Sequence, residues 1–218
     1  MSAQLRLQHC VTKPPKGMSI AMERKDEIIA AATELFAEKG YSATPTSAVA
    51  ERAGVAEGLI FHYFKNKLGV LTHIFSDFAD VYLDGMEKAM DSADDGLNAL
   101  LATIRFHFKI VSEQLPESTV ILRDLPQELI TVESESGSIV TEKSLNQFHL
   151  TEKCIKRGQK DGSIRDVPAD EFAHIIVGML RGVSRLKFQM PGDFVPPDFC
   201  PSVIDFCRQS LSSDNVTE

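Results

Sequence analysis

The most constraining feature of the sequence is a pair of short helical segments joined by one glycine. Thr44 is placed to cap the first segment, about 45–52, and Pro45 suits its first position because the proline lacks an amide hydrogen that would go unbonded there. Gly54 ends this segment, since glycine readily adopts the left-handed backbone of a tight turn. A second segment, about 56–63, follows at once. Preceded by a longer helix, this pair predicts a helix-turn-helix.

Apolar residues recur at helical spacing through the rest of the chain, without an alternating run long enough for a strand. This periodicity predicts a helix over about 23–39, closed by Gly40. It predicts further helices over about 67–90, 95–114, 117–130, 138–160, 168–189 and 198–211. Pro126 interrupts the third of these, and the polar run TVESESG that follows is typical of a loop. With the two short segments, nine helices predict an all-α protein.

Pattern and composition divide the chain into three parts. Residues 1–19 contain two prolines and a glycine but no periodic apolar face, so we expect a flexible tail. Residues 20–66 contain the three N-terminal helices, and residues 67–218 form a larger helical body. The chain has a net charge of −8, yet residues 13–75 carry a small excess of Lys and Arg. This asymmetry indicates a mildly basic module on an acidic body.

Composition excludes several classes of protein. A hydrophobic content of 43% supports a sizeable core and argues against disorder. No apolar run is long enough to span a membrane, and the N-terminus lacks the apolar core of a secretory signal. We therefore expect a cytoplasmic protein.

The sequence shows no signature of a metal centre or a catalytic site. Cys10, Cys154, Cys200 and Cys207 form no CxxC pair, so reduced structural thiols are expected. His9 adjoins Cys10 without further ligands nearby. Zinc-protease, nucleophile-elbow and nucleotide-binding motifs do not occur. We expect no catalytic residues, no metal, no cofactor and no enzymatic activity.

Residues 24–75 resemble the N-terminal DNA-binding domain of the TetR family of bacterial transcriptional regulators. The similarity lies in ELFAEKGY of the first helix, AVAERAGV of the second helix and turn, and LIFHYFKNK of the third helix. The resemblance covers about a quarter of the chain. It implies a homodimer whose third helices enter the major groove of an operator. It also implies a C-terminal domain, residues 67–218, that dimerises and binds a small ligand, and a repressor released from DNA by that ligand.

The resemblance assigns DNA-binding positions in the second and third helices. They are Thr44, Thr46, Ser47, Glu57, Gly58, Leu59, His62, Tyr63 and Lys67. Hydroxyl groups at the start of the second helix suit phosphate oxygens, although Thr44 would serve equally as a cap alone. Tyr63 and Lys67 match phosphate-binding positions, and His62 is the candidate for a base contact, with a solvated or phosphate-facing histidine as the alternative. Gly58 allows close approach to the duplex.

The third helix also needs an apolar side that anchors it. Ile60, Phe61 and Phe64 are expected to pack against the first helix. The sequence departs from the family at Ala56, Leu59, Phe61 and Thr46, where a capping hydroxyl, a polar residue, a tyrosine and an apolar residue are usual. Leu59 can contact a thymine methyl group. With fewer hydrogen-bonding side chains, part of the specificity is expected to come from DNA shape.

Large apolar side chains in the middle helices indicate a pocket for an apolar or amphipathic ligand. The candidate ligand-binding residues are Phe78, Tyr82, Phe106, His107, Phe148, Phe172 and Met179. Polar side chains within apolar stretches would orient the ligand, or else lie on a solvated face or in an internal ion pair. They are Arg105, His107, Arg123, Asp124 and His149, among which His107 shares a stripe with apolar residues.

The last two helices suit a dimer interface. Gly178 and Gly182 lie one turn apart in GMLRG, and this spacing permits close approach of another helix. Val203 and Phe206 of the last helix complete the candidate surface.

Two other functions stay open at this level. An all-α enzyme or small-molecule carrier would need a cluster of catalytic or metal-binding groups in the body, and the sequence shows none at a recognisable spacing. The other possibility is a protein that activates transcription or binds another protein. The sequence cannot separate an activator from a repressor, because the sign of regulation depends on where the operator lies relative to the promoter.

Overall fold

The computed structural model describes residues 16–113, 115–123, 125–130, 135–190 and 198–213. Within these ranges the chain forms ten α-helices and no strand, so the all-α prediction is confirmed. The helices are α1 Lys16–Lys39, α2 Thr46–Ala53, α3 Glu57–Phe64, α4 Lys67–Asp91, α5 Gly96–Ser112, α6 Pro116–Arg123, α7 Gln127–Ile130, α8 Glu135–Asp161, α9 Ala169–Gln189 and α10 Cys200–Leu211. None of the described helices is long and apolar enough to cross a membrane.

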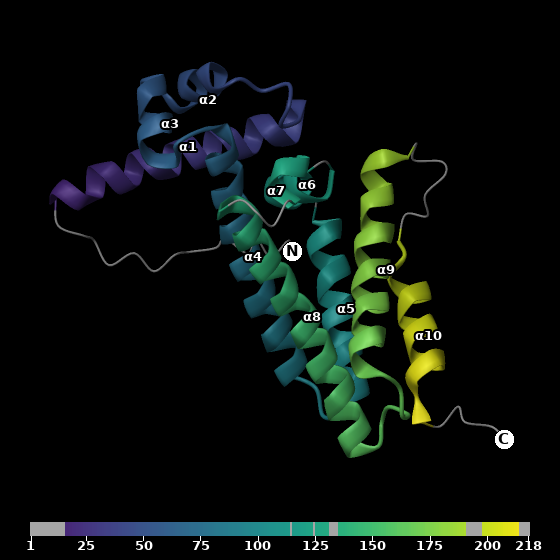
Figure 1. Ribbon diagram of the computed structural model, residues 1–218. Coiled ribbons are helices and arrows are strands. Elements are labelled where there is room, and N and C mark those ends of the chain that lie inside the picture. The colour runs from purple at the N-terminus through teal and green to yellow at the C-terminus, as the bar shows by residue number, and fades with distance from the viewer. Residues whose placement is uncertain (1–15, 114, 124, 131–134, 191–197, 214–218) are drawn as a thin grey trace, which may run out of the picture.

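Two parts of the molecule are visible in Figure 1. Helices α1 to α3 form a head at one end, and α4, α5, α8, α9 and α10 form a bundle. Helix α4 runs from the head into the bundle, while α6 and α7 lie between the two parts. Helices α4 and α6 therefore connect the head to the bundle.

Helix boundaries differ from the sequence prediction in three places. Helix α1 begins at Lys16 and so includes the end of the expected tail; an established helix extends at little cost, and Gly17 lies only in its first turn. The expected helix 117–130 is two helices, since Pro126 cannot continue a helix and also restricts the residue before it. Helix α8 begins at Glu135, within the expected loop, with that carboxylate in its first turn. Residues 1–15 lie outside the described residues.

Two glycines set the turns of the head. Gly40 and Gly54 have φ values of 87° and 66°, as predicted for helix ends that turn sharply. The predicted cap at Thr44 is wrong. Pro45 is the N-cap residue of α2 and provides no side-chain bond, whereas the buried Thr44 hydroxyl donates to the Gly40 carbonyl at 2.8 Å. Thr44 therefore closes the turn after α1 instead of facing outward.

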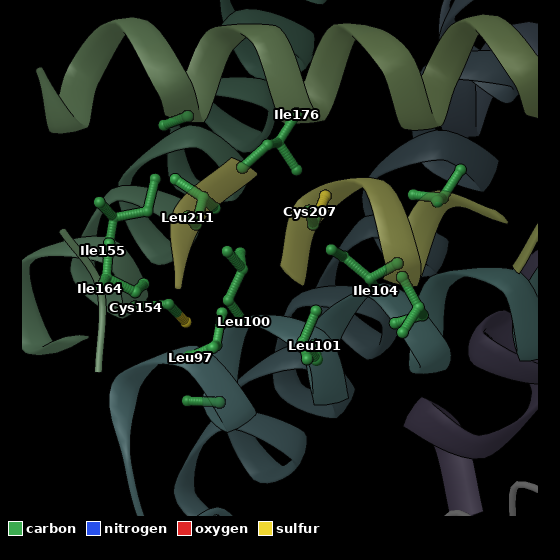
Figure 2. Packing of buried hydrophobic residues seen from close by; sticks show 14 of the residues in the cluster. Leu97, Leu100, Leu101, Ile104, Cys154, Ile155, Ile164, Ile176, Cys207 and Leu211 are labelled. Carbon is green, nitrogen blue, oxygen red and sulfur yellow. The ribbon is translucent and has the colours of Figure 1, made fainter. Parts of the chain in front are cut away.

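Two hydrophobic cores hold the fold together. The first joins the head to α4, α6, α7 and α8, with Ile28, Ile60 and Leu71 among its fully buried members. Packing therefore continues across the expected boundary at 66/67, and the division into two domains remains a proposal. The second core fills the bundle between α5, α8, α9 and α10, where Leu100 and Ile104 meet side chains from the other helices (Figure 2).

The cysteines of the bundle behave as apolar side chains. Cys154 and Cys207 are buried in the second core (Figure 2). Cys200 is half-buried and packs against this core. Burial raises the pKa of Cys154 to about 12 and that of Cys207 to about 11. These three thiols are free and structural, as the sequence predicted; Cys10 lies outside the described residues.

Arg123 attaches α6 to the head. Its Nη1 donates to the Ala37 carbonyl at 2.9 Å, which is one of the carbonyls left unbonded in the last turn of α1. A Cβ atom at Gly40 would lie 2.9 Å from Arg123 Nη2. The guanidinium thus occupies the space beside the end of α1 and holds it against α6.

We expect Arg123→Ala to lower the free energy of unfolding by about 1–2 kcal/mol, because a charge-assisted bond to a half-buried carbonyl is lost. Urea titration measures this change, and amide exchange should quicken in residues 37–44. Arg105→Ala, at an exposed arginine of α5, is the matched control. An equal loss in both variants would show that Arg123 contributes no specific attachment.

Candidate functional site

Helix α3 has one buried face and one exposed face. Ile60 and Phe64 are 0% and 6% exposed and anchor the helix in the first core, as predicted. The expectation that Phe61 is also core is wrong, because its side chain is 50% exposed. Successive residues of a helix point about 100° apart, so the residue after the buried Ile60 turns outward. Gly58, Phe61 and His62 therefore share the exposed face.

Gly58 leaves this face open. A Cβ atom there would meet nothing within 4 Å, so its lack of a side chain serves no packing inside the chain. Leu59 and Tyr63 are half-buried at the edge of the head core. The Tyr63 ring meets the His62 ring edge-on at 5.1 Å between centroids. The face can thus admit a partner close to the α3 backbone.

Thr46 and Glu57 connect the second and third helices. The Thr46 hydroxyl donates to the Glu57 carboxylate at 2.6 Å. Ser47 beside them is exposed. Two candidate DNA-binding side chains therefore bond each other, and this bond helps fix the angle of the helix-turn-helix.

Lys67 points into the head. Its ammonium group donates to the carbonyls of Tyr41 at 2.9 Å and Thr44 at 3.0 Å. It also lies 4.3 Å from the centroid of the Tyr41 ring, and partial burial lowers its pKa. Lys67 thus anchors the turn before α2, while its contact with phosphate stays a prediction.

A cavity of about 290 Å³ lies where α4, α5, α6, α8 and α9 meet. Three of the seven ligand candidates line it: Phe78, Tyr82 and His107. The other apolar lining residues are Phe75, Ala79, Leu83, Ile110, Val111, Ile121, Leu122, Leu125 and Val140. Polar lining comes from Ser118, Lys143, Ser144, Gln147, Arg181 and Arg185. The cavity suits an apolar ligand body with polar contacts in a few places.

The other four ligand candidates do not line this cavity. Phe106 packs against Gly85 and the Tyr82 ring. Phe148 stacks on His174 with 4.5 Å between ring centroids. Phe172 and Met179 pack against the second core. Their apolar character was visible in the sequence, but the side of each helix that faces the cavity was not.

A chain of hydrogen bonds crosses the cavity wall. Arg181 donates to Gln147 Oε1 through Nη2 at 2.6 Å and Nε at 3.2 Å. Gln147 Nε2 donates to the Tyr82 hydroxyl at 3.1 Å, which leaves the Tyr82 hydrogen for His107 Nδ1 at 2.7 Å. His107 therefore carries its own hydrogen on Nε2 and donates it to Ser184 Oγ at 2.8 Å. We call these five residues the relay.

The relay satisfies its own polar groups. No buried side-chain nitrogen or oxygen in the described part of the chain lacks a hydrogen-bond partner. Burial lowers the pKa of His107 from 6.5 to about 4, so the imidazole is neutral at physiological pH. Burial raises the pKa of Tyr82, which keeps its phenol neutral as well. Tyr82 and His107 therefore present no charge to the cavity.

Sequence patterns missed most of the relay. Gln147, Arg181 and Ser184 come from segments far from His107 in the chain, and no local signal joins them. Among the polar candidates, Arg105 and His149 are exposed and Arg123 points to α1. Asp124 lies outside the described residues.

The candidate dimer residues fall into two groups. Gly178 and Gly182 are exposed, and a Cβ atom on either would meet nothing within 4 Å. Phe206 is 55% exposed, and Ile175, which the sequence analysis missed, is 54% exposed. Val203 belongs to the second core and is 5% exposed, so its surface assignment is wrong. An uncovered face thus runs along α9 and the outer side of α10.

We expect the neutral, buried His107 to make stability depend on pH. Its pKa is about 4 in the folded protein but near 6.5 when unfolded, so the unfolded state binds more protons between these values. Stability from this group is fully present above pH 6.5 and falls by about 3 kcal/mol as the pH drops to 4. Urea titrations from pH 7 to 4 should show a shallower decline for His107→Gln than for the wild type. Parallel declines would contradict the assignment.

Comparison with known proteins agrees with this geometry. Residues 28–74 match the family model of the bacterial regulatory proteins of the tetR family. The chain is 26% identical over 140 residues to the fatty acid metabolism regulator protein of Bacillus subtilis (strain 168), covering 64% of this chain and 70% of that protein. It is 26% identical over 157 residues to the HTH-type transcriptional repressor KstR2 of Mycolicibacterium smegmatis, covering 69% and 72% respectively.

The fold is also shared with a solved structure. The transcriptional regulator FadR from Bacillus subtilis, in complex with stearoyl-CoA, matches with a TM-score of 0.72 and 22% identity over 85% of this chain and 98% of that chain. Residues 28–74 carry the match to the family model, and the arrangement of the helices along most of the chain carries the match to the solved structure. Residues 28–74 therefore belong to the tetR family of bacterial regulatory proteins, and the chain as a whole shares the fold of the FadR structure.

Proposed function

We propose that the protein is a dimeric transcriptional repressor that leaves its operator when a small apolar or amphipathic ligand fills the cavity. The observation that carries the DNA-binding part is the exposed face of α3, within the segment that matches the family model. The cavity in the bundle carries the ligand-binding part. The two parts share α4, and α6 contacts both.

The exposed face of α3 suits the major groove. Gly58 lets the duplex approach the helix, and His62 offers a ring nitrogen to a base edge. Phe61 offers an apolar surface to a thymine methyl group, a role that its exposure adds to the original candidates. Ser47, at the start of α2, is placed for a phosphate oxygen.

The cavity wall provides a route from ligand to DNA. Ile121 and Leu122 of α6 line the cavity, while Arg123 of the same helix holds the end of α1. A ligand that pushes α6 outward would move the head with it and change the separation of two heads in a dimer. The FadR structure from Bacillus subtilis holds stearoyl-CoA, and KstR2 is named a repressor, which supports this function.

The uncovered face of α9 and α10 suits a second copy of the chain. Gly178 and Gly182 allow a helix to approach closely, and Ile175 and Phe206 supply apolar area. Figure 1 shows α9 and α10 along the side of the bundle away from α4. Two heads on one dimer would bind two half-sites of an operator.

We expect the purified protein to retard a duplex from its own promoter region, with an affinity that falls steeply as salt rises. His62→Ala should weaken this binding about tenfold, because a lost base contact costs roughly 1–3 kcal/mol. Fluorescence anisotropy with promoter and scrambled duplexes measures affinity and preference together. His149→Ala, at an exposed histidine of α8, should bind as the wild type does. Absence of any retardation would refute the function, and unchanged binding by His62→Ala would refute this docking mode.

We expect Phe206→Glu to convert a dimer to a monomer, because a charge placed in the apolar interface loses its hydration there. Analytical ultracentrifugation measures the mass. Affinity for the operator duplex should fall at least tenfold, since each monomer then binds one half-site. Leu145→Glu, at an exposed leucine of α8, is the matched control. A dimer that survives Phe206→Glu would place the interface elsewhere.

A further inference from the structure

We infer that the cavity holds an amphipathic anion, whose charged end binds Arg181 and Arg185 and whose apolar tail lies inside. This inference rests on the proposed ligand-binding function. It adds the charge of the ligand, its orientation and an approximate length.

Three cationic side chains line the cavity. Lys143 of α8 pairs with the Asp80 carboxylate. Arg185 forms no ion pair with any described residue, and Arg181 bonds the neutral amide of Gln147. Even with Asp80 counted, the lining has an excess of positive charge in a chain whose net charge is −8. A bound anion would balance this positive charge.

The two arginines lie where the cavity opens to solvent. They are the lining residues whose side chains are exposed, whereas the rest are buried or half-buried. They are four residues apart on α9, so both side chains leave the same face of the helix. One carboxylate, phosphate or sulfate group can therefore reach both.

Unused donors remain on both guanidinium groups. An arginine has five N–H groups, and Arg181 directs two of its nitrogens at Gln147. The bond to Gln147 and the Phe148 ring, 5.3 Å from the guanidinium carbon, hold Arg181 in place. A planar fork held in this way is suited to bidentate bonding of an anion.

The interior cannot take the charged end. Most of its walls are apolar, Lys143 is paired with Asp80, and the relay satisfies the polar groups of Tyr82, His107 and Gln147 among themselves. An anion placed there would lose its hydration and gain fewer unpaired donors than the two arginines offer. The tail therefore points inward. A cavity of about 290 Å³ holds on the order of ten groups of water or methylene size, since each takes roughly 30 Å³.

A carboxylate from a second copy of the chain would be another partner for Arg185. Gly178, Gly182 and Arg185 all lie on the exposed face of α9, so a dimer brings the copies close to this point. The relay fixes Arg181 toward the cavity instead, and both arginines line it. The observations thus favour a ligand, and the experiment separates the two partners.

The test compares three probes with the same ten-carbon chain: decanoate, 1-decanol and decyltrimethylammonium. Isothermal titration calorimetry with the full-length protein gives each Kd below the concentration at which the probe forms micelles. We expect decanoate to bind at least tenfold more tightly than decanol, and the cationic probe to bind most weakly. Equal affinity for decanoate and decanol would overturn the inference but leave ligand binding intact. Failure of all three to bind would refute the proposed cavity function as well.

Substitution assigns the preference to Arg185. We expect Arg185→Glu to reduce the ratio of decanol Kd to decanoate Kd at least tenfold, with Arg185→Gln intermediate. Arg105→Glu, at the exposed arginine of α5, makes the same charge change away from the cavity and should keep the ratio. Thermal melting shows whether each variant is folded. If Arg185→Glu does not fold, the neutral Arg185→Gln variant still tests the inference. An unchanged ratio in Arg185→Gln and Arg185→Glu, with loss of the dimer by ultracentrifugation, would assign the arginine to the partner chain instead.

Discussion

The structure depends on α4 being one continuous helix that belongs to both hydrophobic cores. Its first turns bury Val70, Leu71 and Ile74 against the head, and its last turns bury Met90 in the bundle. A head of three helices with two of only eight residues has little stability of its own, because such short helices rely on packing. Their packing surface is supplied by α1 and by α4. Any movement of α4 therefore moves the surface that would face DNA.

The relay places a polar constraint on the other side of the same helix. Tyr82 of α4 bonds Gln147 of α8 and His107 of α5, and His107 bonds Ser184 of α9. A buried polar chain costs desolvation energy, which is offset only when each member is bonded. Every member of the relay is bonded, so the four helices have one arrangement in which all of these hydrogen bonds form together. A ligand beside Tyr82 would act on an arrangement with little tolerance for partial shifts.

The sequence alone predicts the all-α class, nearly all helix positions and both glycine turns, because helical periodicity and glycine conformation are local properties. It also predicts that the side chains of Ile60 and Phe64 are buried and anchor α3. It places Phe61 wrongly, since composition cannot show which side of an eight-residue helix meets α1. Thr44 fails for a related reason: a buried carbonyl at Gly40 competes for its hydroxyl. The resemblance to a known family predicts DNA contacts, yet Lys67 in this chain bonds two carbonyls of its own head.

The cavity was the part least predictable from the sequence. Its lining comes from five helices, and its net charge depends on which cationic side chains find an ion-pair partner in the folded chain. Arg181 and Arg185 sit on α9 beside Gly178 and Gly182, so one helix borders the cavity and the proposed dimer face. An anion bound to these arginines would neutralise positive charge beside the proposed dimer face. Under this proposal, ligand binding acts on α6 at one end of the cavity and on the dimer contact at the other. The separation of the two heads would then respond to both.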